Sequence, residues 1–528
     1  MRQSLAVALF SMALATPVSA ETLTILHTND FHSRVEPINK YNSGCKPEDN
    51  DAGKCFGGYA RLITAIKAAR ADTNNSILVD GGDQFQGSLF YTYYKGKVAA
   101  EMMNALGYDA MTVGNHEFDD GPEVLRGFVN AVDFPVLMSN ADISQERLLN
   151  NIIAPSKVIE RGGEEIGLIG LTPEDTADLA SPGKAVKFTN PSKAVAREVK
   201  KLTEAGVKRI IVLSHSGYLV DKIVASDVDG IDVIVGGHSN TFLSNISDKA
   251  QGPYPTWVKN PSGGKTAIVQ AFAYGKYLGK LDVEFDDDGV VVSALGEPII
   301  VGGEIAEDTT LKERIAELAQ PLEDIRQKKV AETSGPIDGD RSNCRARECE
   351  MGNLVAEALL DRVKDQGVSL SIYNGGGLRA SMDAGEITMG EVLTVLPFQN
   401  VVSTFELRGS DVVKALEAGV SQIEEGKGRF PQVAGLRYTI DQSVPPNAGR
   451  VSDVEVRKGD EYVPIDLAAT YGVVSNDFLR SGGDGYAIFE EKAEQAYDFG
   501  PSVENVVADY LSAQSPYKPV LDGRITVK

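Results

Sequence analysis

Short apolar runs rich in β-branched residues alternate with longer helix-like segments from Glu21 to about Val301, and this alternation constrains the fold more than any other feature. The runs TLTIL, SILVD, DAMTV, FPVLMS, IGLIG, RIIVLS and DVIVGG are separated by stretches such as GYARLITAIKAARAD. Strands that alternate with helices in this way form a largely buried sheet, because the helices pack on its faces. The first part of the chain is therefore predicted to be an α/β layer structure.

The rest of the chain predicts a second α/β domain. A length of 528 residues is too great for one ordinary hydrophobic core. Residues 304–330 place apolar side chains at helical spacing on a charged background, with Pro321 as a kink. Beyond them, the helix candidate MGNLVAEALLDRV is mixed with strand candidates such as SLSIYN and YGVVSN. We predict domains over residues 21–303 and 331–528, with a linking helix over 304–330 between them.

The two ends of the chain bear on its location. Residues 1–20 combine an early Arg2, an apolar stretch too short to span a membrane and small residues before Glu21. This is the pattern of a secretory signal peptide, cleaved here after Ala20. The C-terminal segment LDGRITVK has no hydrophobic tail for a glycolipid anchor or a transmembrane helix. The prediction is a periplasmic or secreted protein without a membrane anchor, present as a monomer or a homodimer.

The four cysteines fall into two local pairs, Cys45 with Cys55 and Cys344 with Cys349. In an oxidising compartment, such close spacing favours two short disulfide loops. A zinc site made of four thiolates is the alternative, which the lack of Cys-x-x-Cys spacing disfavours.

The overall charge limits the partners. A formal net charge of −23 argues against nucleic-acid polymers and anionic membranes, because binding many phosphates needs clustered Lys and Arg. Any phosphate site in this chain must therefore be local, made by a metal or by a few arginines.

The five histidines all lie in the first domain, where each follows or ends a predicted strand: His27, His32, His116, His215 and His238. Structural histidines would be expected in both halves of the chain. Polar side chains at the carboxyl ends of strands gather in one crevice of an open α/β sheet. Carboxylates and an amide at matching exits complete a set of six candidates: Asp30, His32, Asp83, Asn115, His215 and His238. Two divalent cations need such mixed oxygen and nitrogen ligands with one bridging carboxylate, for which Asp83 is the natural candidate.

The order of these motifs resembles a known family. DFH, GGDQ, GNHEFD, SHSG and GGHSN resemble the calcineurin-like metallophosphoesterase domain of the 5′-nucleotidase family. NGGGLR, LPFQN and FLRSGGDGY resemble that family's C-terminal nucleotide-binding domain, and GGHSNTFL, AYGKYLG, CRAREC and MGNL are similar to its AMP-hydrolysing ecto-enzymes. The resemblance covers essentially the whole chain after residue 20. It implies a four-layer α/β sandwich in the first domain and an α/β nucleotide-binding domain in the second.

The resemblance also implies roles at the metal centre. Asp30 and His32 would bind one metal and Asn115 and His215 the other, with His238 completing the set and Asp83 bridging. Family members usually hold zinc, and manganese or cobalt are alternatives.

Beside the ligands, His116 would stabilise the transition state or protonate the leaving oxygen, with Asp119 holding its ring in the useful tautomer. Glu117 and Asp120 have no assigned role and are expected to be solvated or structural. His27 would either orient a ligand from behind or pack in the core.

In the second domain, the resemblance implies a site for the nucleotide. Arg379 and Arg345 match the phosphate and ribose contacts, because guanidinium groups suit phosphate oxygens. Phe398 and Phe478 match two rings that sandwich the base. The remaining candidates are Asn374 for the base or ribose, Asp484 for the ribose hydroxyls and, from the first domain, Asn240 for the metal or phosphate.

The implied reaction is hydrolysis of a nucleoside 5′-monophosphate, AMP above others, by water that two metals hold in line with the leaving 5′-oxygen. The domains would close over the nucleotide, with residues 304–330 as the hinge. One alternative is a broader phosphohydrolase acting on ADP, ATP, UDP-sugars or 2′,3′-cyclic nucleotides. The other is a non-catalytic nucleotide-binding surface protein, which predicts damaged ligand positions that this sequence does not have.

Overall fold

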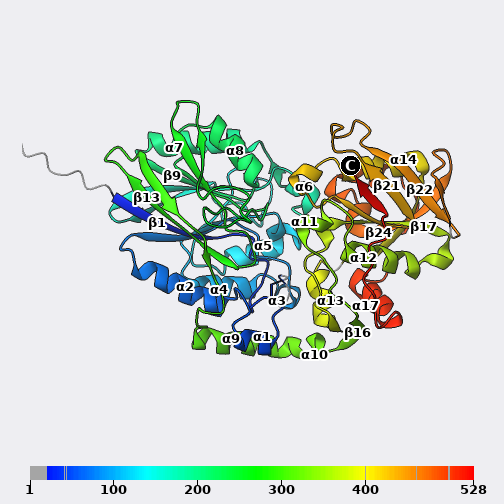
Figure 1. The fold of residues 1–528 in the computed structure, drawn as a ribbon. Helices are drawn as coiled ribbons and strands as arrows, with labels where there is room; N and C mark the ends of the chain where they lie inside the picture. The colour runs from blue at the N-terminus through cyan, green and yellow to red at the C-terminus, as the bar shows by residue number, and fades with distance from the viewer. Residues whose placement is uncertain (1–20, 41, 43, 399, 460, 498–499) are drawn as a thin grey trace, which may run out of the picture.

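A computed structural model describes residues 21–528 except 41, 43, 399, 460 and 498–499. The signal-peptide prediction falls on residues 1–20 and lies outside the described residues. Two α/β bodies lie side by side, and a helical segment joins them along one edge of the molecule (Figure 1). No helix within the described ranges has the length and apolar character needed to cross a membrane.

Two sheets lie face to face in the first body. The first sheet has the order β14 (Val291–Gly296), β13 (Tyr277–Phe285), β1 (Glu21–Thr28), β2 (Ser76–Asp80), β3 (Ala110–Thr112), β4 (Val136–Leu137), with β15 (Ile299–Ile300) paired to β13. The second has the order β11 (Thr256–Lys259), β12 (Lys265–Val269), β10 (Val233–Val235), β9 (Arg209–Ser214), β7 (Glu164–Leu171), β6 (Ser156–Arg161). The central strands β1 to β4 are parallel, as are β7, β9, β10 and β12.

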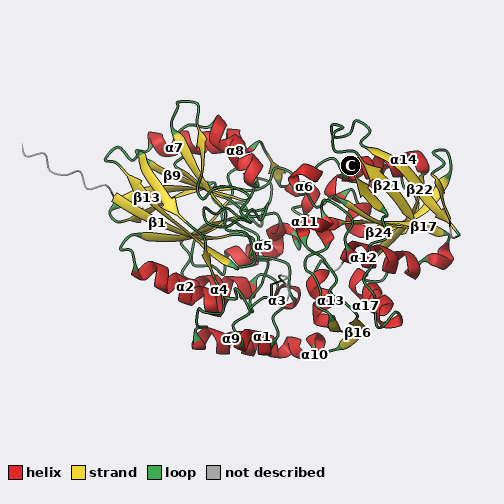
Figure 2. Cartoon of the chain, in the orientation of Figure 1, coloured by secondary structure: helices red, strands yellow, loops and turns green. Residues whose placement is uncertain are grey.

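Three apolar cores show that this body has four layers. Ile25, Val79, Leu168 and Val235 belong to the core that the two sheets share. A second core packs helices α2 (Tyr59–Ala71), α4 (Lys97–Leu106) and α5 (Gly121–Val129) on the outer face of the first sheet. A third packs α7 (Pro191–Glu204) and α8 (Tyr218–Asp227) on the second sheet. The predicted four-layer α/β sandwich is confirmed, and Figure 2 shows the sheets between their helices.

The segment predicted as a linking helix is divided. Helix α9 (Thr309–Ala319) is followed by a 3-10 turn, η2 (Gln320–Leu322), which contains Pro321, and then by α10 (Glu323–Arg326). The side chain of Asp308 caps α9 by accepting a hydrogen bond from the Leu311 amide. Leu311, Ile315 and Leu318 pack into the core beneath the first sheet. The linker is therefore attached to the first body by its own apolar face.

The second body is also built on sheets. Its larger sheet has the order β20 (Pro431–Ala434), β17 (Val368–Asn374), β24 (Thr470–Asn476), β19 (Val402–Arg408), β25 (Glu494–Tyr497). A smaller sheet contains β23 (Glu461–Pro464), β22 (Val451–Lys458), β21 (Leu436–Ile440) and β26 (Ile525–Val527). Helices α12 (Glu350–Arg362) and α17 (Val503–Ala513) share one apolar core with the sheet, and α14 (Gly409–Gly419) and α16 (Ala487–Lys492) share another. Helix α13 (Met389–Val395) belongs to the core of α12 and α17 and also contacts α10 of the linker.

Candidate active site

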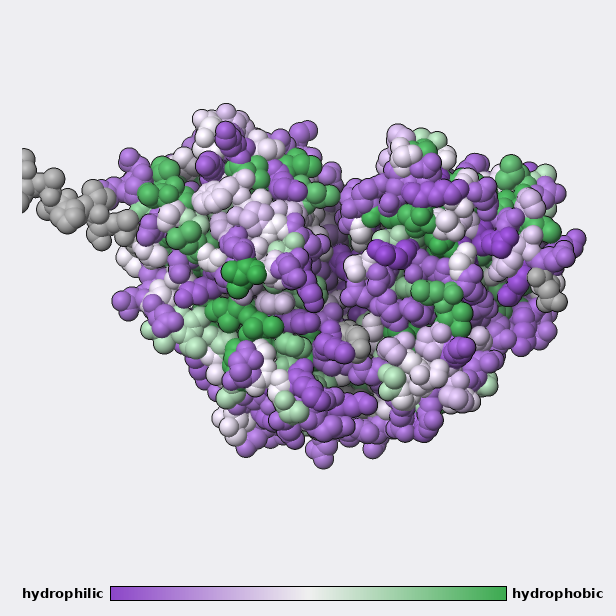
Figure 3. Space-filling model, in the orientation of Figure 1, coloured by the Kyte–Doolittle hydropathy of each residue, from purple (hydrophilic) through white to green (hydrophobic). Residues whose placement is uncertain are grey.

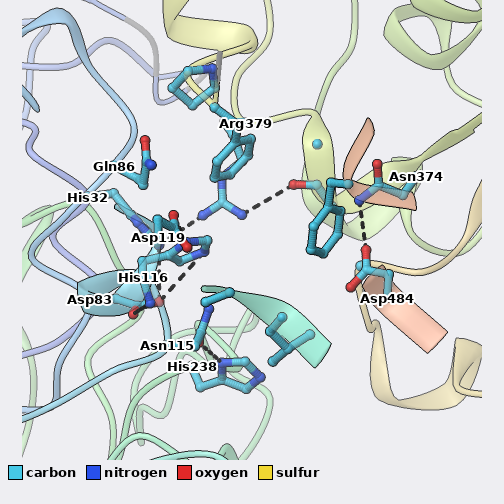
Figure 4. Close-up of a pocket in the computed structure, with 18 of the residues that line it drawn as sticks. His32, Asp83, Gln86, Asn115, His116, Asp119, His238, Asn374, Arg379 and Asp484 are labelled. Atoms are coloured by element: carbon cyan, nitrogen blue, oxygen red, sulfur yellow. Dashed lines mark hydrogen bonds and ion pairs between the residues drawn. The ribbon is translucent and has the colours of Figure 1, made fainter. Parts of the chain in front are cut away.

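The six residues predicted as ligands meet at the edge of the first body that faces the second body. Each follows a strand of one of the two stacked sheets, so the parallel strands point these loops in one direction. The strand and residue pairs are β1 with Asp30 and His32, β2 with Asp83, β3 with Asn115, β9 with His215 and β10 with His238. Five of the six are buried, and His238 is partly exposed. Figure 4 shows four of these side chains, those of His32, Asp83, Asn115 and His238, close to one another.

The Asp83 carboxylate lies at the centre of this cluster. Its Oδ2 atom is 2.9 Å from His215 Nε2 and 4.0 Å from both His32 Nε2 and His116 Nε2. Asp30 Oδ1 lies 3.9 Å from His32 Nε2 and 3.9 Å from His215 Nε2. The central place of Asp83 is the one expected of a carboxylate shared by two ions.

A further close contact links the two remaining candidates. His238 Nδ1 lies 2.9 Å from Asn115 Oδ1, and the His238 amide donates a hydrogen bond to Asp30 Oδ2 at 2.8 Å. The loops that follow β1, β3 and β10 are thus joined directly.

The ligand loops hold unusual backbone conformations. Five non-glycine residues of the site have positive φ: Asp30 at 51°, His32 at 50°, Asp83 at 59°, His238 at 66° and Asn240 at 50°. The left-handed region costs an L-residue roughly 1 kcal/mol, and such strain collects at functional sites. The surrounding fold therefore holds these side chains in place at an energetic cost.

The chemistry of the cluster fits divalent metal ions. Nitrogen and carboxylate oxygen atoms of His32, Asp83 and His116 lie within 4.8 Å of one another, as do those of Asp83, His215 and His238. Asp30 Oδ1 is buried and has no hydrogen-bond partner among the described residues. His215 Nδ1 faces the Gly81 carbonyl at 2.5 Å and His32 Nδ1 faces the Phe85 carbonyl at 3.2 Å. These carbonyls orient the rings so that both Nε2 atoms point into the cluster, as in metal-binding histidines.

His116 lies beside the ligand candidates, and one of its ring nitrogens is bound to its neighbour Asp119. His116 Nδ1 lies 2.6 Å from Asp119 Oδ2, and the His116 amide donates to Asp83 Oδ1 at 2.9 Å. Burial lowers the pKa of His116, but the negative charges of Asp119 and Asp83 raise it by more than burial lowers it. The pKa of His116 therefore lies above its ordinary value. The short helix η1 (His116–Phe118) turns the ring toward the pocket. The arrangement is a histidine with one nitrogen bound to a carboxylate and the other available.

Glu117 is structural, which is one of the two alternatives expected for it. It is 0% exposed, and its carboxylate accepts hydrogen bonds from the amides of Asp83 at 3.0 Å, Gln84 at 2.8 Å, Phe85 at 3.2 Å and Gly114 at 2.7 Å. A side chain at Gly114 would place its Cβ only 2.2 Å from Asp83 Oδ1, so glycine is required there. Glu117 therefore ties the loop after β2 to the loop after β3.

The other residues left open in the first body also have partners. Asp120 accepts a hydrogen bond from the Tyr91 hydroxyl at 2.6 Å and pairs with Lys95 at 3.1 Å. His27 Nε2 bonds the Tyr254 hydroxyl at 2.8 Å, and burial lowers the pKa of His27 to about 3. His27 is thus a packed core histidine and contacts none of the six ligand candidates.

The second body brings all six of its predicted residues to the same place. One pocket between the bodies is lined by Asp30, His32, Asp83, Asn115, His116, Asp119 and His238 from the first body and by Arg345, Asn374, Arg379, Phe398, Phe478 and Asp484 from the second. In the space-filling view, hydrophilic residues flank the hollow between the bodies (Figure 3). His215 lies behind the lining, as does Asn240, whose Oδ1 atom is buried and has no hydrogen-bond partner among the described residues.

Contacts across the pocket link residues of the second body to the cluster of ligand candidates. Arg379 Nη2 lies 2.9 Å from His32 Nε2, and the Phe398 ring stacks on His116 with centroids 5.5 Å apart. Farther into the second body, Asn374 donates to Asp484 Oδ2 at 2.7 Å (Figure 4). The two bodies thus share one site.

Two disulfides account for all the cysteines. Cys45 is bonded to Cys55 and Cys344 to Cys349, which confirms both predicted pairs and removes the four-thiolate zinc alternative. Arg345 lies inside the second of these loops, directly after helix α11 (Arg341–Cys344).

Sequence reasoning missed two cations of the second body that contact His238 in the cluster of ligand candidates. Arg341 Nη2 donates to the His238 carbonyl at 3.0 Å, and Lys427 Nζ lies 3.3 Å from His238 Nε2. Both residues line the shared pocket. Lys427 lies between two glycines in the segment GKGR, a composition that suits a loop near an anion and could have been noticed. Arg341 carries no comparable signal.

Comparisons with known proteins agree with this arrangement. Residues 23–242 match the family model of calcineurin-like phosphoesterases, and residues 329–491 match that of the 5′-nucleotidase C-terminal domain. The chain is 38% identical over 524 residues to the 5′-nucleotidase of Bos taurus and to that of Homo sapiens, covering 95% of this chain and 90% of each relative. It is also similar to the crystal structure of a 5′-nucleotidase precursor from Thermus thermophilus. The identity is 40% and the TM-score 0.92, with 96% of this chain and 99% of that chain covered.

Proposed function

The chain belongs to the 5′-nucleotidase family, and from this premise we propose that it hydrolyses nucleoside 5′-monophosphates, AMP above others, to nucleoside and phosphate. Members of this family are metal-dependent phosphoric monoester hydrolases, and this chain is one of them. The observation that carries the proposal is the shared pocket. A cluster of metal-ligand type and a histidine–aspartate pair face arginines and aromatic rings across it.

The metal centre would be held by the six clustered residues. Asp30, His32, Asp83, Asn115, His215 and His238 are the proposed ligands, with zinc the first candidate and manganese or cobalt the alternatives. When bound, two divalent ions supply Lewis-acid charge to phosphoryl oxygens and an activated water. The central Asp83 carboxylate is the residue that both ions would share.

His116 and Asp119 would act on the leaving group. Because Nδ1 of His116 is bound to Asp119, its Nε2 atom is the one available to hold or move a proton. We infer that His116 donates a proton or a hydrogen bond to the departing 5′-oxygen, while Asp119 fixes the ring orientation. Arg379, which already lies against His32, would neutralise charge on the phosphoryl oxygens.

The nucleoside would bind to the second body. Phe398 and Phe478 offer faces for the base, and stacking on them tolerates different bases. Asp484 and Asn374, which bond each other here, would turn to the ribose or the base, and Arg345 would contact the ribose or phosphate. Asn240 would support the metal or the phosphate from the first body.

Substrate entry would require relative motion of the two domains. Arg379 contacts His32 and Phe398 stacks on His116, so side chains of the two domains already meet where the substrate would bind. We propose that residues 304–330, where α9 and α10 are separated at Pro321, form the hinge between domains at residues 21–303 and 331–528. The two disulfides favour an extracytoplasmic location, periplasmic or secreted.

The test is phosphate release by metal-analysed protein from AMP, ADP, UDP-glucose and 2′,3′-cyclic AMP, compared as kcat/KM. AMP is expected to give the highest value. The Asp83→Ala variant, purified in the same way, controls for contaminating phosphatases. A clear preference for ADP or UDP-glucose would replace the monophosphate assignment with the broader phosphohydrolase.

A further inference from the structure

The segment that follows β12, residues 270–275 (QAFAYG), contacts ligand loops from both sheets of the first body. Strand β12 is the parallel neighbour of β10, after which His238 lies. The Ala271 amide donates a hydrogen bond at 3.0 Å to Oδ1 of Asn29, which follows β1 of the other sheet and directly precedes Asp30. The segment thus lies between two of the proposed ligands, and it has no role so far.

Gln270 is bonded to the chain on both sides of His238. Its side chain is 0% exposed, and its Nε2 atom donates to the Gly237 carbonyl at 2.7 Å. Its Oε1 atom accepts from the Ser239 hydroxyl at 3.0 Å and from the Thr241 amide. A single buried amide group therefore fixes the turn that carries the His238 ring.

Asn29 fixes the carboxylate of Asp30 in a similar way. Its Nδ2 atom donates to Asp30 Oδ2 at 2.9 Å and to the Phe272 carbonyl at 2.6 Å. The Tyr274 amide donates to the Asp30 carbonyl at 2.8 Å. Asp30 Oδ1 is buried and has no hydrogen-bond partner among the described residues. One carboxylate oxygen is therefore held by the protein, and the other is left for an ion.

The backbone of this segment is strained at two aromatic residues. Phe272 has φ 59° and Tyr274 has φ 62°, values that bulky side chains rarely adopt. Such strain persists only where the surrounding structure over-determines the conformation, and it collects at functional sites. The Phe272 carbonyl and the Tyr274 amide are the groups that reach Asn29 and Asp30. The strained conformation thus places backbone groups against the ligand loop.

We propose that Gln270 is a positioning residue of the metal centre, with Asn29 as its counterpart for Asp30. Gln270 holds the turn of His238, and Asn29 holds the Asp30 carboxylate, in the directions that a metal ion requires. The inference rests on the proposed function, because the ions are those that the six ligand candidates would bind. Neither residue is itself a ligand, since both amide groups are bonded to protein atoms.

The experiment measures the zinc affinity of the chelator-stripped protein by competition with a chromogenic chelator, together with the visible absorption spectrum of the cobalt-loaded protein. Gln270→Met keeps the length of the side chain and removes its hydrogen bonds. We expect zinc to bind about 10- to 100-fold more weakly, the usual effect of losing a group that orients a ligand. The cobalt spectrum should change, excess zinc should restore most of kcat, and KM for AMP should stay that of the parent.

Gln432→Met is the matched control. Gln432 is also 0% exposed, and its amide group bonds the backbone of the second body at Cys344, Arg347 and Cys349. This variant should lose stability as Gln270→Met does, but it should bind zinc as tightly as the parent. Asn29→Ala, which removes a hydrogen bond from Asp30 Oδ2, should weaken zinc binding and change the cobalt spectrum.

Two results would overturn the proposal, and a third would separate it from the proposed function. If Gln270→Met binds zinc as tightly as Gln432→Met and only melts at a lower temperature, Gln270 has a structural role alone. Should Gln270→Met fail to fold, Asn29→Ala decides, and parental zinc affinity with an unchanged cobalt spectrum would refute the positioning role. If the parent binds zinc and the variants weaken it, but no phosphate is released from AMP, the proposed function fails and the positioning role stands.

Discussion

The two faces of the pocket differ in the kind of side chain they carry. The first body presents carboxylates, an amide and imidazoles, and all five histidines of the chain lie there. The second body presents guanidinium, ammonium and phenyl groups together with the amide of Asn374 and the carboxylate of Asp484. In the proposed function, metal chemistry and nucleotide recognition would therefore lie on separate bodies, and neither face alone would form a complete site.

The faces also differ in how rigidly they are held. Five site residues of the first body have left-handed backbone conformations, whereas among the predicted residues of the second body only Asp484, with φ 52°, does. Metal ligands need exact directions, so strain is tolerated where strand ends meet. Stacking and charge neutralisation tolerate small displacements. Substitutions on the first face should therefore change turnover, and those on the second should change affinity.

Removal of the central carboxylate should have the largest effect. Asp83→Ala takes away the oxygen atoms that lie between His32, His116 and His215, so we expect metal content to fall and kcat/KM to drop on the order of 10³-fold or more. Metal analysis and phosphate release measure the two effects. Asp120→Ala, which removes another carboxylate from the same pocket, should retain metal. Full metal content in Asp83→Ala would show that Asp83 is no shared ligand.

Loss of the imidazole beside the ligands should reduce turnover but spare the metals. His116→Ala is expected to lower kcat about 10²- to 10⁴-fold, the usual worth of a positioned acid or base. Asp119→Asn should lower it less, because the ring remains and only its orientation weakens. Metal content is measured on the same samples. A His116→Ala variant that loses its metals, or that keeps full activity, contradicts the division between ligand and catalytic histidine.

Removal of an aromatic ring from the second face should mainly change the affinity for the nucleotide. Phe398→Leu removes one stacking surface, and base stacking contributes about 1–3 kcal/mol, so KM for AMP should rise roughly tenfold. Turnover at saturation should change much less. Because stacking accepts any base, KM for UMP should rise by a similar factor. A rise in KM confined to one base would show that Phe398 selects bases by another contact. A loss confined to kcat would contradict the assignment of affinity to the second face.

The smallest expected effect lies in the first body away from the pocket. Asp232 accepts a hydrogen bond from the Ile210 amide at 2.7 Å, and burial raises the pKa of Asp232 to about 7. A raised folded pKa stabilises the protein below the unfolded value near 4, and this contribution is lost as pH rises toward 7. Asp232→Asn should therefore gain stability relative to the parent on going from pH 5 to pH 8, by about 1 kcal/mol or less because the group is half-buried.

Thermal melting of Asp232→Asn and the parent at both pH values measures this difference. Turnover and phosphate affinity of the variant should equal those of the parent. A gain in relative stability toward low pH would contradict the assigned direction of the pKa shift.

How much the sequence predicts depends on whether a feature is local. The six ligand candidates and the His116–Asp119 pair lie in short motifs after strands, and parallel strands carry such motifs to one edge. Their convergence was therefore predictable. The break of the linker at Pro321 was foreseen as a kink, but its separation into two helices was not. Tertiary neighbours were missed, since Arg341 and Lys427 meet His238 only across the interface, 103 and 189 residues away in sequence.

The buried carboxylate of Glu117 has a consequence for how the metal centre is assembled. Four backbone amides are bound to it, so we expect the loops bearing Asp83 and Asn115 to reach their final shape during folding, without an ion. Reconstitution after chelation should therefore be a fast association reaction, with a rate proportional to metal concentration and without a slow refolding phase. The enzyme would therefore fold first and bind its metal ions afterwards.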